Sequence, residues 1–344
     1  MSDDGNRLKL PPFRDAGFYR KRKHSSYQEV SAPRLASSVA DTHAHLHMLP
    51  DPAFELARCA VNGVRFLCMI VDPAEDGEGP IERLAGWESD ARRELAGLGA
   101  AQGCAVPRVR IAVGIHPHNA SAWDDRAQDA LRRLAADPRV CAIGEIGLDY
   151  HYDLSPREVQ RSAFRSQLRL AKELGLPVAL HVREAHDEAF AILSEEGFPP
   201  AGTLLHCCSL DADGLAPWIE AGCFIAYGGA LTFKKLESAR EAAVRVPLNR
   251  LLTETDAPFM TPEPMRGLGC TPAHVVFTAA ALAQMKAQYD GISPDDALAA
   301  LFNNALGLLD RPRGVAAPGA SPAVSESAES ASDAFQPSAE TERN

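Results

Sequence analysis

The sequence of 344 residues lacks the marks of a secreted, membrane-bound or strongly basic protein. No run approaches the ~18 consecutive apolar residues of a membrane-spanning helix, so we expect no membrane association. The opening stretch is polar and does not resemble a signal peptide. Acidic residues outnumber basic ones, which gives a formal net charge of −11 at pH 7. This charge disfavours a broad basic surface for duplex nucleic acid, although a local cationic patch or a bound metal could still attract a phosphate.

Motifs of several other enzyme classes are also missing. Neither Gly-x-Gly-x-x-Gly nor the Gly-x-x-x-x-Gly-Lys-Ser/Thr loop is present, so nothing indicates a nucleotide cradle. The Gly-x-Ser-x-Gly turn of serine hydrolases is absent as well. None of the eight cysteines forms a Cys-x-x-Cys pair, and Cys68 and Cys141 lie within apolar runs. Buried, reduced thiols are therefore expected, which favours a cytoplasmic protein. No feature indicates an obligate protein partner.

Composition divides the chain into three parts. Residues 1–35 are polar and contain a basic cluster at residues 20–24. We expect a disordered tail there; the alternative is an arm that contacts a phosphate or a partner. Residues 36–311 hold the folded domain. Residues 312–344 are rich in alanine, serine, proline and glutamate. This low-complexity tail is expected to be disordered, because it cannot bury enough apolar surface to offset the entropy of ordering.

Between the tails, short apolar runs alternate with amphipathic stretches. Residues 156–174 have apolar positions at helical spacing, and Gly175 would end that helix. Residues 78–106 form a long connection that could hold an extra helix. Alternating strands and helices indicate a parallel sheet, and eight strands favour a (β/α)8 TIM barrel over a doubly wound open sheet. The eight expected strands begin near residues 36, 64, 109, 140, 176, 202, 223 and 250.

Residues able to bind a metal stand at the ends of most of these strands. Barrel active sites are built at the carboxyl ends of the strands. A neutral core would not hold so many ionisable groups there. The candidate metal ligands, which come from five strands, are His43, His45, Glu145, His181, His206 and Asp256.

The first strand and the last could hold one divalent cation together. His43 and His45 are two positions apart on a strand, so both side chains face the same side. Asp256 would add the negative charge that neutral imidazoles lack, and it could also accept a proton from water as a catalytic base. The alternative role for Asp256 is to cap the turn that follows it.

Glu145 could bridge that cation and a second one, because a carboxylate has two oxygens. His181 and His206 on neighbouring strands would complete the second site. Glu145 is thus a candidate catalytic residue as well as a ligand; the alternative is a buried ion-pair or capping group. Two cations can lower the pKa of a shared water and hold a phosphate. The histidine-rich ligand set favours zinc or manganese, although magnesium would still be admitted.

Three further residues are candidate substrate contacts. His116 and His118 follow the third strand and could position a substrate phosphate; a supporting or structural role is equally compatible with their place. Arg183, at the end of the fifth strand, could pair with an anionic substrate. The alternative for Arg183 is a surface ion pair with Glu184 or Asp187.

The candidate residues lie in six ordered sequence blocks: DTHAHL (41–46), GIHPH (114–118), GEIGLDY (144–150), PVALHVREA (177–185), LLHCCS (204–209) and TETDAP (253–258). These blocks resemble the TatD-type metal-dependent hydrolases, a family often described as deoxyribonucleases. The resemblance extends over about residues 40–310 and implies the same grouping of the six ligands around two metals. It also implies hydrolysis of phosphodiester bonds in DNA.

We therefore expect a hydrolase that acts on ester bonds with metal-activated water. The first hypothesis is a deoxyribonuclease, such as a 3′-5′ exonuclease, whose nucleic-acid substrate is single-stranded DNA or a strand end. The alternative is lactone, amide or phosphotriester hydrolysis on the same two-metal site. A third hypothesis, a catalytically silent scaffold, is disfavoured by the complete ligand set. Glutamate at position 145 favours the first hypothesis, because some related barrels bridge their metals with a modified lysine.

Overall fold

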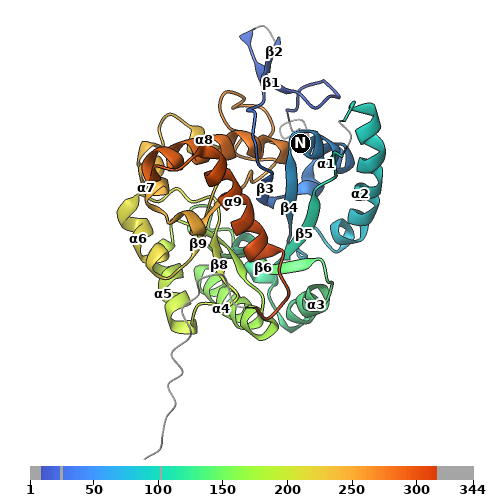
Figure 1. Ribbon diagram of the computed structural model, residues 1–344. Helices are drawn as coiled ribbons and strands as arrows, with labels where there is room; N and C mark the ends of the chain where they lie inside the picture. The colour runs from blue at the N-terminus through green and yellow to red at the C-terminus, as the bar shows by residue number, and fades with distance from the viewer. Residues whose placement is uncertain (1–8, 24–25, 101–102, 316–344) are drawn as a thin grey trace, which may run out of the picture.

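The computed structural model describes residues 9–23, 26–100 and 103–315 and contains an eight-stranded parallel sheet (Figure 1). Each strand of this sheet pairs with the next one along the chain. All eight predicted strands are present, which confirms the strand count. They are β3 (Val39–Ala44), β4 (Val64–Val71), β5 (Arg108–Val113), β6 (Val140–Asp149), β7 (Val178–Arg183), β8 (Thr203–Leu205), β9 (Phe224–Tyr227) and β10 (Leu251–Thr253).

The first and last strands of this sheet meet and close it into a barrel. The amide of Asp256 donates to the carbonyl of His43 at 2.9 Å, and the amide of His45 donates to the carbonyl of Ala257 at 2.8 Å. The wholly buried carboxylate of Asp41 accepts hydrogen bonds from the amide and the hydroxyl of Thr255 on the other side of the seam. The seam thus combines main-chain and side-chain bonds, and the fold is the predicted (β/α)8 barrel.

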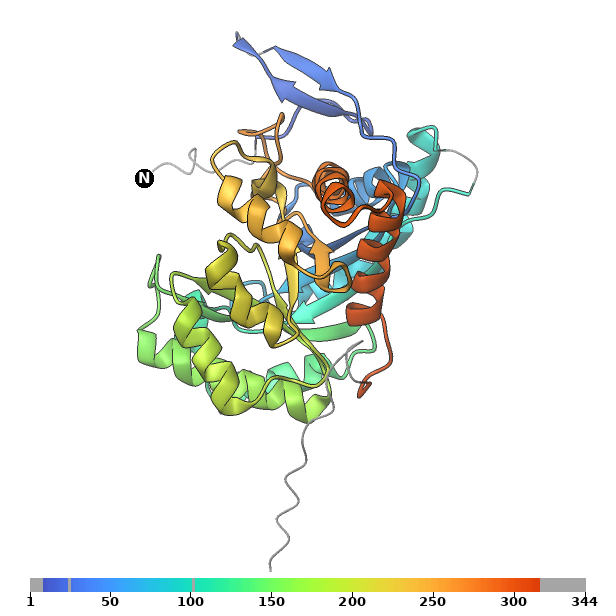
Figure 2. The same ribbon diagram turned by 60° about the vertical axis from the view of Figure 1, so that its left-hand side comes forward.

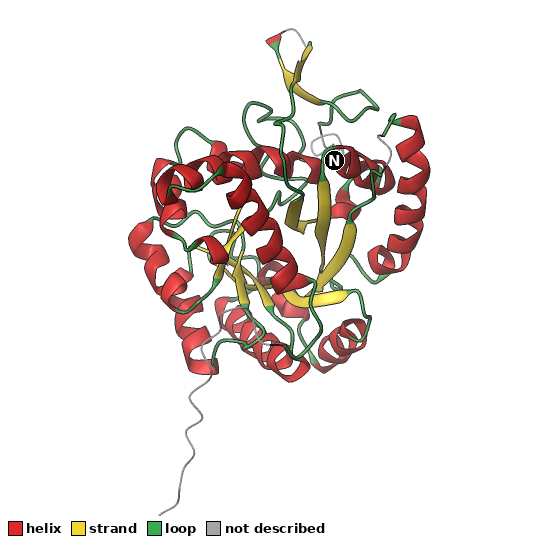
Figure 3. Cartoon of the chain, in the orientation of Figure 1, coloured by secondary structure: helices red, strands yellow, loops and turns green. Residues whose placement is uncertain are grey.

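Helices follow the strands and surround the barrel (Figures 1 and 3). The helix predicted at residues 156–174 is α4, which ends where Gly175 adopts a φ of 63°. The helix within residues 78–106, α2, is the regular connection between β4 and β5 rather than the extra helix expected there. The helices are α1 (Pro52–Val61), α2 (Gly79–Gly97), α3 (Asp125–Ala135), α4 (Arg157–Leu174), α5 (His186–Glu196), α6 (Ala212–Glu220), α7 (Glu237–Arg245), α8 (Val275–Asp290) and α9 (Pro294–Leu309).

Alternation along each strand separates two apolar layers. In β4, Leu67 and Met69 belong to the layer between strands and helices, whereas Phe66 and Cys68 belong to the barrel interior. The amino ends of the strands enclose an apolar interior that α9 covers, with Leu308 among the residues it buries there. Figure 1 looks onto this end, where α9 crosses in front of the strands. We call this end the floor and the end at the carboxyl termini of the strands the mouth.

A β-hairpin precedes the barrel, and it corrects part of the tail predicted for residues 1–35. Strands β1 (Phe18–Lys21) and β2 (Tyr27–Val30) pair antiparallel. Phe18 is 1% exposed. The sequence concealed this hairpin because its strands have four residues each and a single fully buried side chain. Residues 1–8 and 24–25 lie outside the described residues.

The barrel domain ends close to the predicted boundary at residue 311. Helix α9 ends at Leu309, and the chain then returns along the barrel. Arg313 donates to the carbonyl of Val140 at 3.2 Å, and the amide of Gly314 donates to that of Gly175 at the same distance. The remainder of the predicted low-complexity tail, from residue 316 onward, lies outside the described residues.

Within the described ranges, none of the helices combines the length and apolar character that crossing a membrane requires. All eight cysteines of the chain are free thiols, as their spacing predicted. The sulfur atoms of Cys68 and Cys141 lie 4.0 Å apart in the barrel interior and form no disulfide.

Candidate metal centre

The inward-facing positions of the strands change from apolar to polar at the mouth. In β4 the interior series Phe66, Cys68 and Ile70 is followed two residues later by Asp72. In β8, Leu204 is followed by His206 in the same way. Because side chains alternate along a strand, each polar residue points into the barrel from the same face as the apolar residues before it. The strand pattern therefore gathers ionisable groups in one place.

One group of candidate ligands is formed by His43, His45 and Asp256, with one oxygen of Glu145. The Oε2 atom of Glu145 lies 3.2 Å from Nε2 of His43 and 3.8 Å from Nε2 of His45. The Oδ1 atom of Asp256 lies 3.6 Å from Nε2 of His45 and 3.9 Å from Nε2 of His43. Ligand atoms in a tetrahedral shell of ~2.0–2.1 Å lie roughly 3.3 Å apart, so this group has the spacing of a cation site.

A second group is formed by the other oxygen of Glu145 with His181 and His206. The Oε1 atom of Glu145 lies 2.7 Å from Nδ1 of His181 and 2.7 Å from Nε2 of His206. The two histidine nitrogens lie 3.3 Å apart. The two oxygens of a single carboxylate thus face two different sets of histidines. The structure brings all six predicted ligands together in these two groups.

The backbone around the site adopts conformations that position the ligands. Asp256 has a φ of 56°, which is uncommon for a residue other than glycine. Its amide is held by the carbonyl of His43, so the seam of the barrel fixes this conformation. Gly147 has a φ of 146°, and a Cβ atom there would lie 1.9 Å from the carbonyl oxygen of His181. Glycine at 147 therefore allows β6 to approach β7 and brings the ligands of the two strands together.

The polar atoms of the site fit a pair of divalent cations. His43 is wholly buried, and neither of its ring nitrogens has a hydrogen-bond partner among the described residues. The same holds for Nδ1 of His206. A buried polar atom without a partner costs about 1–3 kcal/mol, and a cation bound by His43 would remove that cost for one of its two ring nitrogens. Buried imidazoles around buried carboxylates are also the donor set that transition metals prefer.

The electrostatics of the second group show where positive charge is stabilised. Burial alone lowers the pKa of His206, but the carboxylate of Glu145 raises it to about 10. Burial alone raises the pKa of Glu145, but the charges of His206 and His43 lower it well below its usual range. The site therefore favours a cationic group beside an ionised carboxylate, and a metal ion can take the place of the proton on the histidine.

Two buried carboxylates outside the predicted set lie next to the histidines. Asp149 is wholly buried, and its Oδ2 atom lies 3.0 Å from Nε2 of His181 and 2.8 Å from Nε2 of His118. Glu254 is also wholly buried and lies 3.7 Å from Nδ1 of His206. When Nε2–H of His181 donates a hydrogen bond to the carboxylate of Asp149, Nδ1 of the neutral ring is left unprotonated and faces Glu145.

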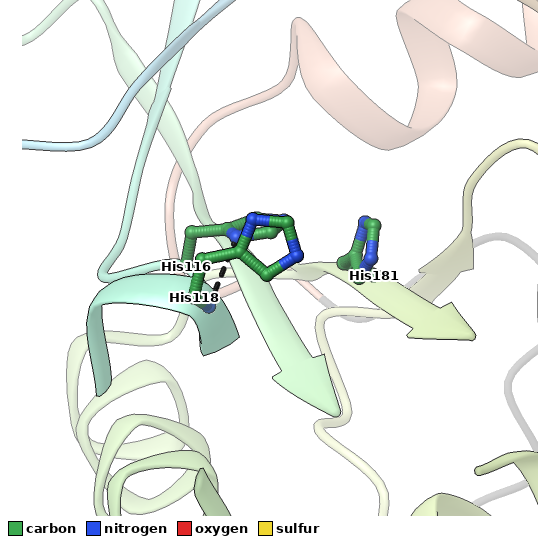
Figure 4. Close-up of side chains that lie close together, drawn as sticks. All are labelled: His116, His118 and His181. Atoms are coloured by element: carbon green, nitrogen blue, oxygen red, sulfur yellow. Dashed lines mark hydrogen bonds between the residues drawn. The ribbon is translucent and has the colours of Figure 1, made fainter. Parts of the chain in front are cut away.

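His116 and His118 stand beside His181 at the edge of the site (Figure 4). They come from η3 (Pro117–Ala122) and the residue before it, and the amide of His118 donates to Nδ1 of His116 at 3.2 Å. The Nε2 atom of His116 lies 3.8 Å from Oε1 of Glu145. Burial lowers the pKa of His116 well below its usual value. His116 is therefore a neutral group near the second ligand group, whereas His118 acts on His181 through Asp149.

A cavity of about 490 Å³ opens above the ligands at the mouth. Arg183 lies on its wall, with its guanidinium 4.8 Å from the ring centre of Tyr152. No carboxylate of the described residues lies within ion-pair distance of Arg183, so the surface pair with Glu184 or Asp187 is not formed. The cavity also contains Phe259, which is half exposed at the rim.

Three acidic residues that line or support the site did not stand out in the sequence. Asp72 directly follows β4 and lines the cavity, where it accepts hydrogen bonds from the amide of His116 and the side chain of Asn119. The only sign of Asp72 in the sequence was its position directly after a predicted strand, where site residues are expected. Asp149 and Glu254 lie within or next to strands that also carry a ligand, but their burial and their partners depend on neighbouring strands.

Metal-dependent barrel hydrolases hold their metals with histidines and carboxylates at the carboxyl ends of the barrel strands, which is the arrangement seen in this site. Comparison with known proteins places the chain in that class. It belongs to the family described as TatD related DNase, whose model matches residues 40–310. The resemblance seen in the sequence blocks is thereby confirmed.

Individual relatives agree with this assignment. A Mycobacterium tuberculosis protein named uncharacterized metal-dependent hydrolase TatD is 34% identical over 257 residues, which covers 72% of this chain and 90% of the relative. A Pantoea vagans protein named 3′-5′ ssDNA/RNA exonuclease TatD is 44% identical over 156 residues, covering 44% of this chain and 59% of the relative. The crystal structure of the Escherichia coli TatD homologue YJJV superposes with a TM-score of 0.65 at 28% identity, covering 80% of this chain and 98% of the other.

Proposed function

We propose that this protein is a two-cation deoxyribonuclease that removes nucleotides from single-stranded DNA or from strand ends. The observation that carries the proposal is the placement of Glu145, whose two oxygens face two separate histidine groups. We assign the first cation to His43, His45 and Asp256, and the second to His181 and His206. The name of the Pantoea vagans relative, a 3′-5′ ssDNA/RNA exonuclease, supports this substrate class.

When bound, two divalent cations supply Lewis acidity toward a phosphate and lower the pKa of water. The histidine-rich ligand set favours Zn²⁺ or Mn²⁺ over Mg²⁺, which prefers an oxygen shell. Because Glu145 would help to hold both cations, we also propose that the two would act as one unit.

Asp256 is the proposed proton acceptor. Burial alone raises its pKa, but the neighbouring ring of His45 and the charges of His206 and His43 lower it. The carboxylate is therefore ionised. Its side chain is 15% exposed and lines the cavity, which lets it receive a proton from an attacking water.

The cavity supports a single-stranded substrate. The guanidinium of Arg183 has no ion-pair partner among the described residues and can pair with a phosphate, and His116 and His118 also line the cavity. Tyr152 and Phe259 at the rim are 54% and 50% exposed. Exposed rings can stack on unpaired bases, a contact that a base in a duplex does not offer. A volume of about 490 Å³ accommodates a small molecule or a strand terminus.

The eight free cysteines are compatible with a reducing compartment, and we propose that the reaction takes place in the cytoplasm.

The test is hydrolysis of a 5′-labelled 20-nucleotide single strand by chelator-treated protein that is reconstituted with Zn²⁺, Mn²⁺ or Mg²⁺. We expect stepwise shortening by the wild type and a loss of rate of about 1,000-fold or more in Asp256→Asn, because the proton acceptor is removed. Blunt duplex DNA, a lactone and a phosphotriester are run in parallel. If the single strand is cut no faster by the wild type than by the variant with every metal, the nuclease proposal is rejected; turnover of the lactone or the phosphotriester would then identify the alternative.

A further inference from the structure

The β1–β2 hairpin carries the charge that the rest of the chain lacks. Residues 9–35 contain seven lysines and arginines and two acidic residues, whereas the whole chain has a formal net charge of −11. Lys21, Arg22 and Lys23 at the hairpin end are exposed, and no carboxylate of the described residues lies within ion-pair distance of them. In Figures 1 and 2 the hairpin stands clear of the barrel. It is therefore an isolated basic arm on an acidic protein.

The base of the hairpin is fixed to the barrel. Phe18 packs edge-on against the rings of His274 and Phe277, with centroid distances of 5.1 and 4.9 Å. The guanidinium of Arg58 lies over the ring of Phe18, 5.0 Å from the ring centre, and it also donates a hydrogen bond to the carbonyl of Gly17. A fixed arm loses little conformational entropy when a ligand binds to it.

One face of the hairpin gathers aromatic rings beside the cations. In the pairing register, Tyr19 lies opposite Glu29 and Lys21 lies opposite Tyr27, so these four side chains share the face that Phe18 does not use. The ring of Phe13 covers this face, with its centroid 4.3 Å from that of Tyr19 and 5.7 Å from that of Tyr27. The Phe13 side is thereby an aromatic surface next to Lys21.

Hydrogen bonds to Asp15 hold this aromatic surface in place. The hydroxyl of Tyr19 donates to Asp15 at 2.6 Å, and the amide of Gly17 donates to the same carboxylate at 2.8 Å. These bonds fold residues 13–19 back so that Phe13 lies against the hairpin. Phe13 nevertheless remains 45% exposed, which leaves part of its ring available to a ligand.

The segment that leads into the hairpin runs past the rim of the mouth. The carbonyl of Lys9 accepts a hydrogen bond from the amide of Gly269 at 3.0 Å. Gly269 belongs to the same connection between β10 and α8 as Phe259 and Met260, which line the cavity above the metal ligands. The arm and the mouth are thus joined through one rim segment.

We propose that the hairpin face made of Phe13, Tyr19, Lys21 and Tyr27, together with Arg22 at the hairpin end, binds single-stranded nucleic acid that extends out of the mouth. The cations would pair with phosphates, and the exposed ring of Phe13 would stack on an unpaired base. This combination of basic and aromatic side chains is typical of surfaces that bind single strands without sequence preference. The proposal rests on the nuclease function proposed above, and it adds a second contact that favours long strands over short ones.

The test is fluorescence anisotropy of a labelled, phosphorothioate-linked 20-nucleotide oligothymidylate, which resists hydrolysis, titrated with the metal-loaded full-length protein. The charge variant is Lys21→Glu/Arg22→Glu, and the stacking variant is Phe13→Ala. The matched control is Arg92→Glu/Arg93→Glu, which reverses two exposed charges on α2. Thermal unfolding of each variant, followed by circular dichroism, checks that the barrel is intact.

We expect the charge variant to bind about tenfold more weakly at 0.1 M salt. The slope of log affinity against log salt should become shallower by roughly 1.4, since each phosphate contact to a single strand contributes about 0.7. The Phe13→Ala variant should lose about fivefold in affinity with the slope unchanged, because stacking involves no charge. The control should remain within about twofold of the wild type. The losses should be larger for the 20-nucleotide strand than for a 4-nucleotide strand.

Equal affinities and salt slopes in the wild type and both hairpin variants would overturn the proposal, as would the absence of any binding by the wild type. Hydrolysis of the unmodified 4-nucleotide strand by the same preparations separates the two proposals. If the wild type cuts it but the hairpin variants bind the long strand normally, the nuclease function stands and the hairpin contact falls. The other explanation is that this face binds a second copy of the chain, which light scattering tests. If the wild type is a dimer and the hairpin variants are monomers with unchanged DNA affinity, the face is a dimer interface and the proposal is rejected.

Discussion

The floor and the mouth of the barrel are built on the same strands, yet their inward-facing positions carry opposite chemistry. At the floor, side chains such as Phe66, Leu204 and Leu252 pack against Leu308 of α9. At the mouth, two residues after Leu204 and just past the end of β8, the interior position is His206. The floor buries apolar surface at a gain of about 1.5–3 kcal/mol for each large side chain. The mouth instead buries ionisable groups that stabilise the fold little without a cation.

This difference shows how one architecture separates stability from chemistry. The floor is covered by a helix, so water and substrate are kept out. The mouth is open to a cavity of about 490 Å³, so a ligand can reach the buried carboxylates. Substitutions at the mouth should therefore change metal binding and rate more than the free energy of unfolding, whereas substitutions at the floor should do the reverse.

The largest effect is expected for Glu145→Gln, which keeps the side-chain size and removes the charge that both ligand groups share. We expect kcat/KM to fall by about 1,000-fold or more and the bound cation content to fall below two per chain. The free energy of unfolding in chelator should be unchanged or higher, because a buried carboxylate is replaced by a neutral amide.

Cation content is measured by elemental analysis, and the exposed substitution Glu241→Gln on α7 is the matched control. Full activity with two bound cations in the Glu145 variant would show that this carboxylate does not bridge the cations. The proposed chemical difference between mouth and floor would then be contradicted.

The next effect is expected at the floor. Leu308 is 1% exposed and packs into the barrel interior. Leu308→Ala should lower the free energy of unfolding by about 2–5 kcal/mol through lost burial and the cavity left behind. Denaturant unfolding measures this, with Asn303→Ala on the exposed side of α9 as control. A change in cation affinity of the folded Leu308 variant would contradict the separation of the two ends.

A smaller effect is expected for Asp149→Asn, which alters the support of a ligand rather than a ligand. Asp149 accepts from His181 and His118, so an amide there would no longer fix the tautomer of His181. We expect cation affinity to weaken by about 10–100-fold, with activity restored by excess metal. Titration against a chelator of known affinity gives the affinity, and Asp153→Asn on the exposed surface is the control. An unchanged affinity would limit Asp149 to a structural role.

The smallest effect is expected for Arg183→Ala at the outer edge of the mouth. The guanidinium has no ion-pair partner among the described residues and lines the cavity. Its loss should raise KM for single-stranded DNA by about 5–10-fold, because one charge-assisted contact to a phosphate disappears. Cation content should stay the same, and Arg183→Lys should recover part of the loss. A fall in cation content instead would place Arg183 among the groups that hold the metals.

The hydrophobic pattern of the sequence was sufficient to predict the barrel and the mouth. Strand periodicity located all eight strands, and histidines and carboxylates at their ends pointed to six candidate ligands from five strands, which the structure brings together. These inferences succeeded because alternation along a parallel strand fixes both which face a residue occupies and which end of the barrel it reaches. Both the face and the end of the barrel follow from a residue's position in its own strand, without reference to residues far away in the sequence.

The tertiary structure decided what depends on partners far apart in the chain. Neighbouring strands, rather than the local sequence, decide which oxygen of Glu145 faces which histidines. They also bury Asp149 and Glu254 beside the histidines. The hairpin is ordered by contacts of Phe18 with His274 and Phe277, more than 250 positions away. The sequence by itself therefore determined the architecture and the ligand types, because these follow from short-range periodicity. The pairing of ligands, their supporting carboxylates and the basic arm were decided only when long-range packing fixed the side chains against one another.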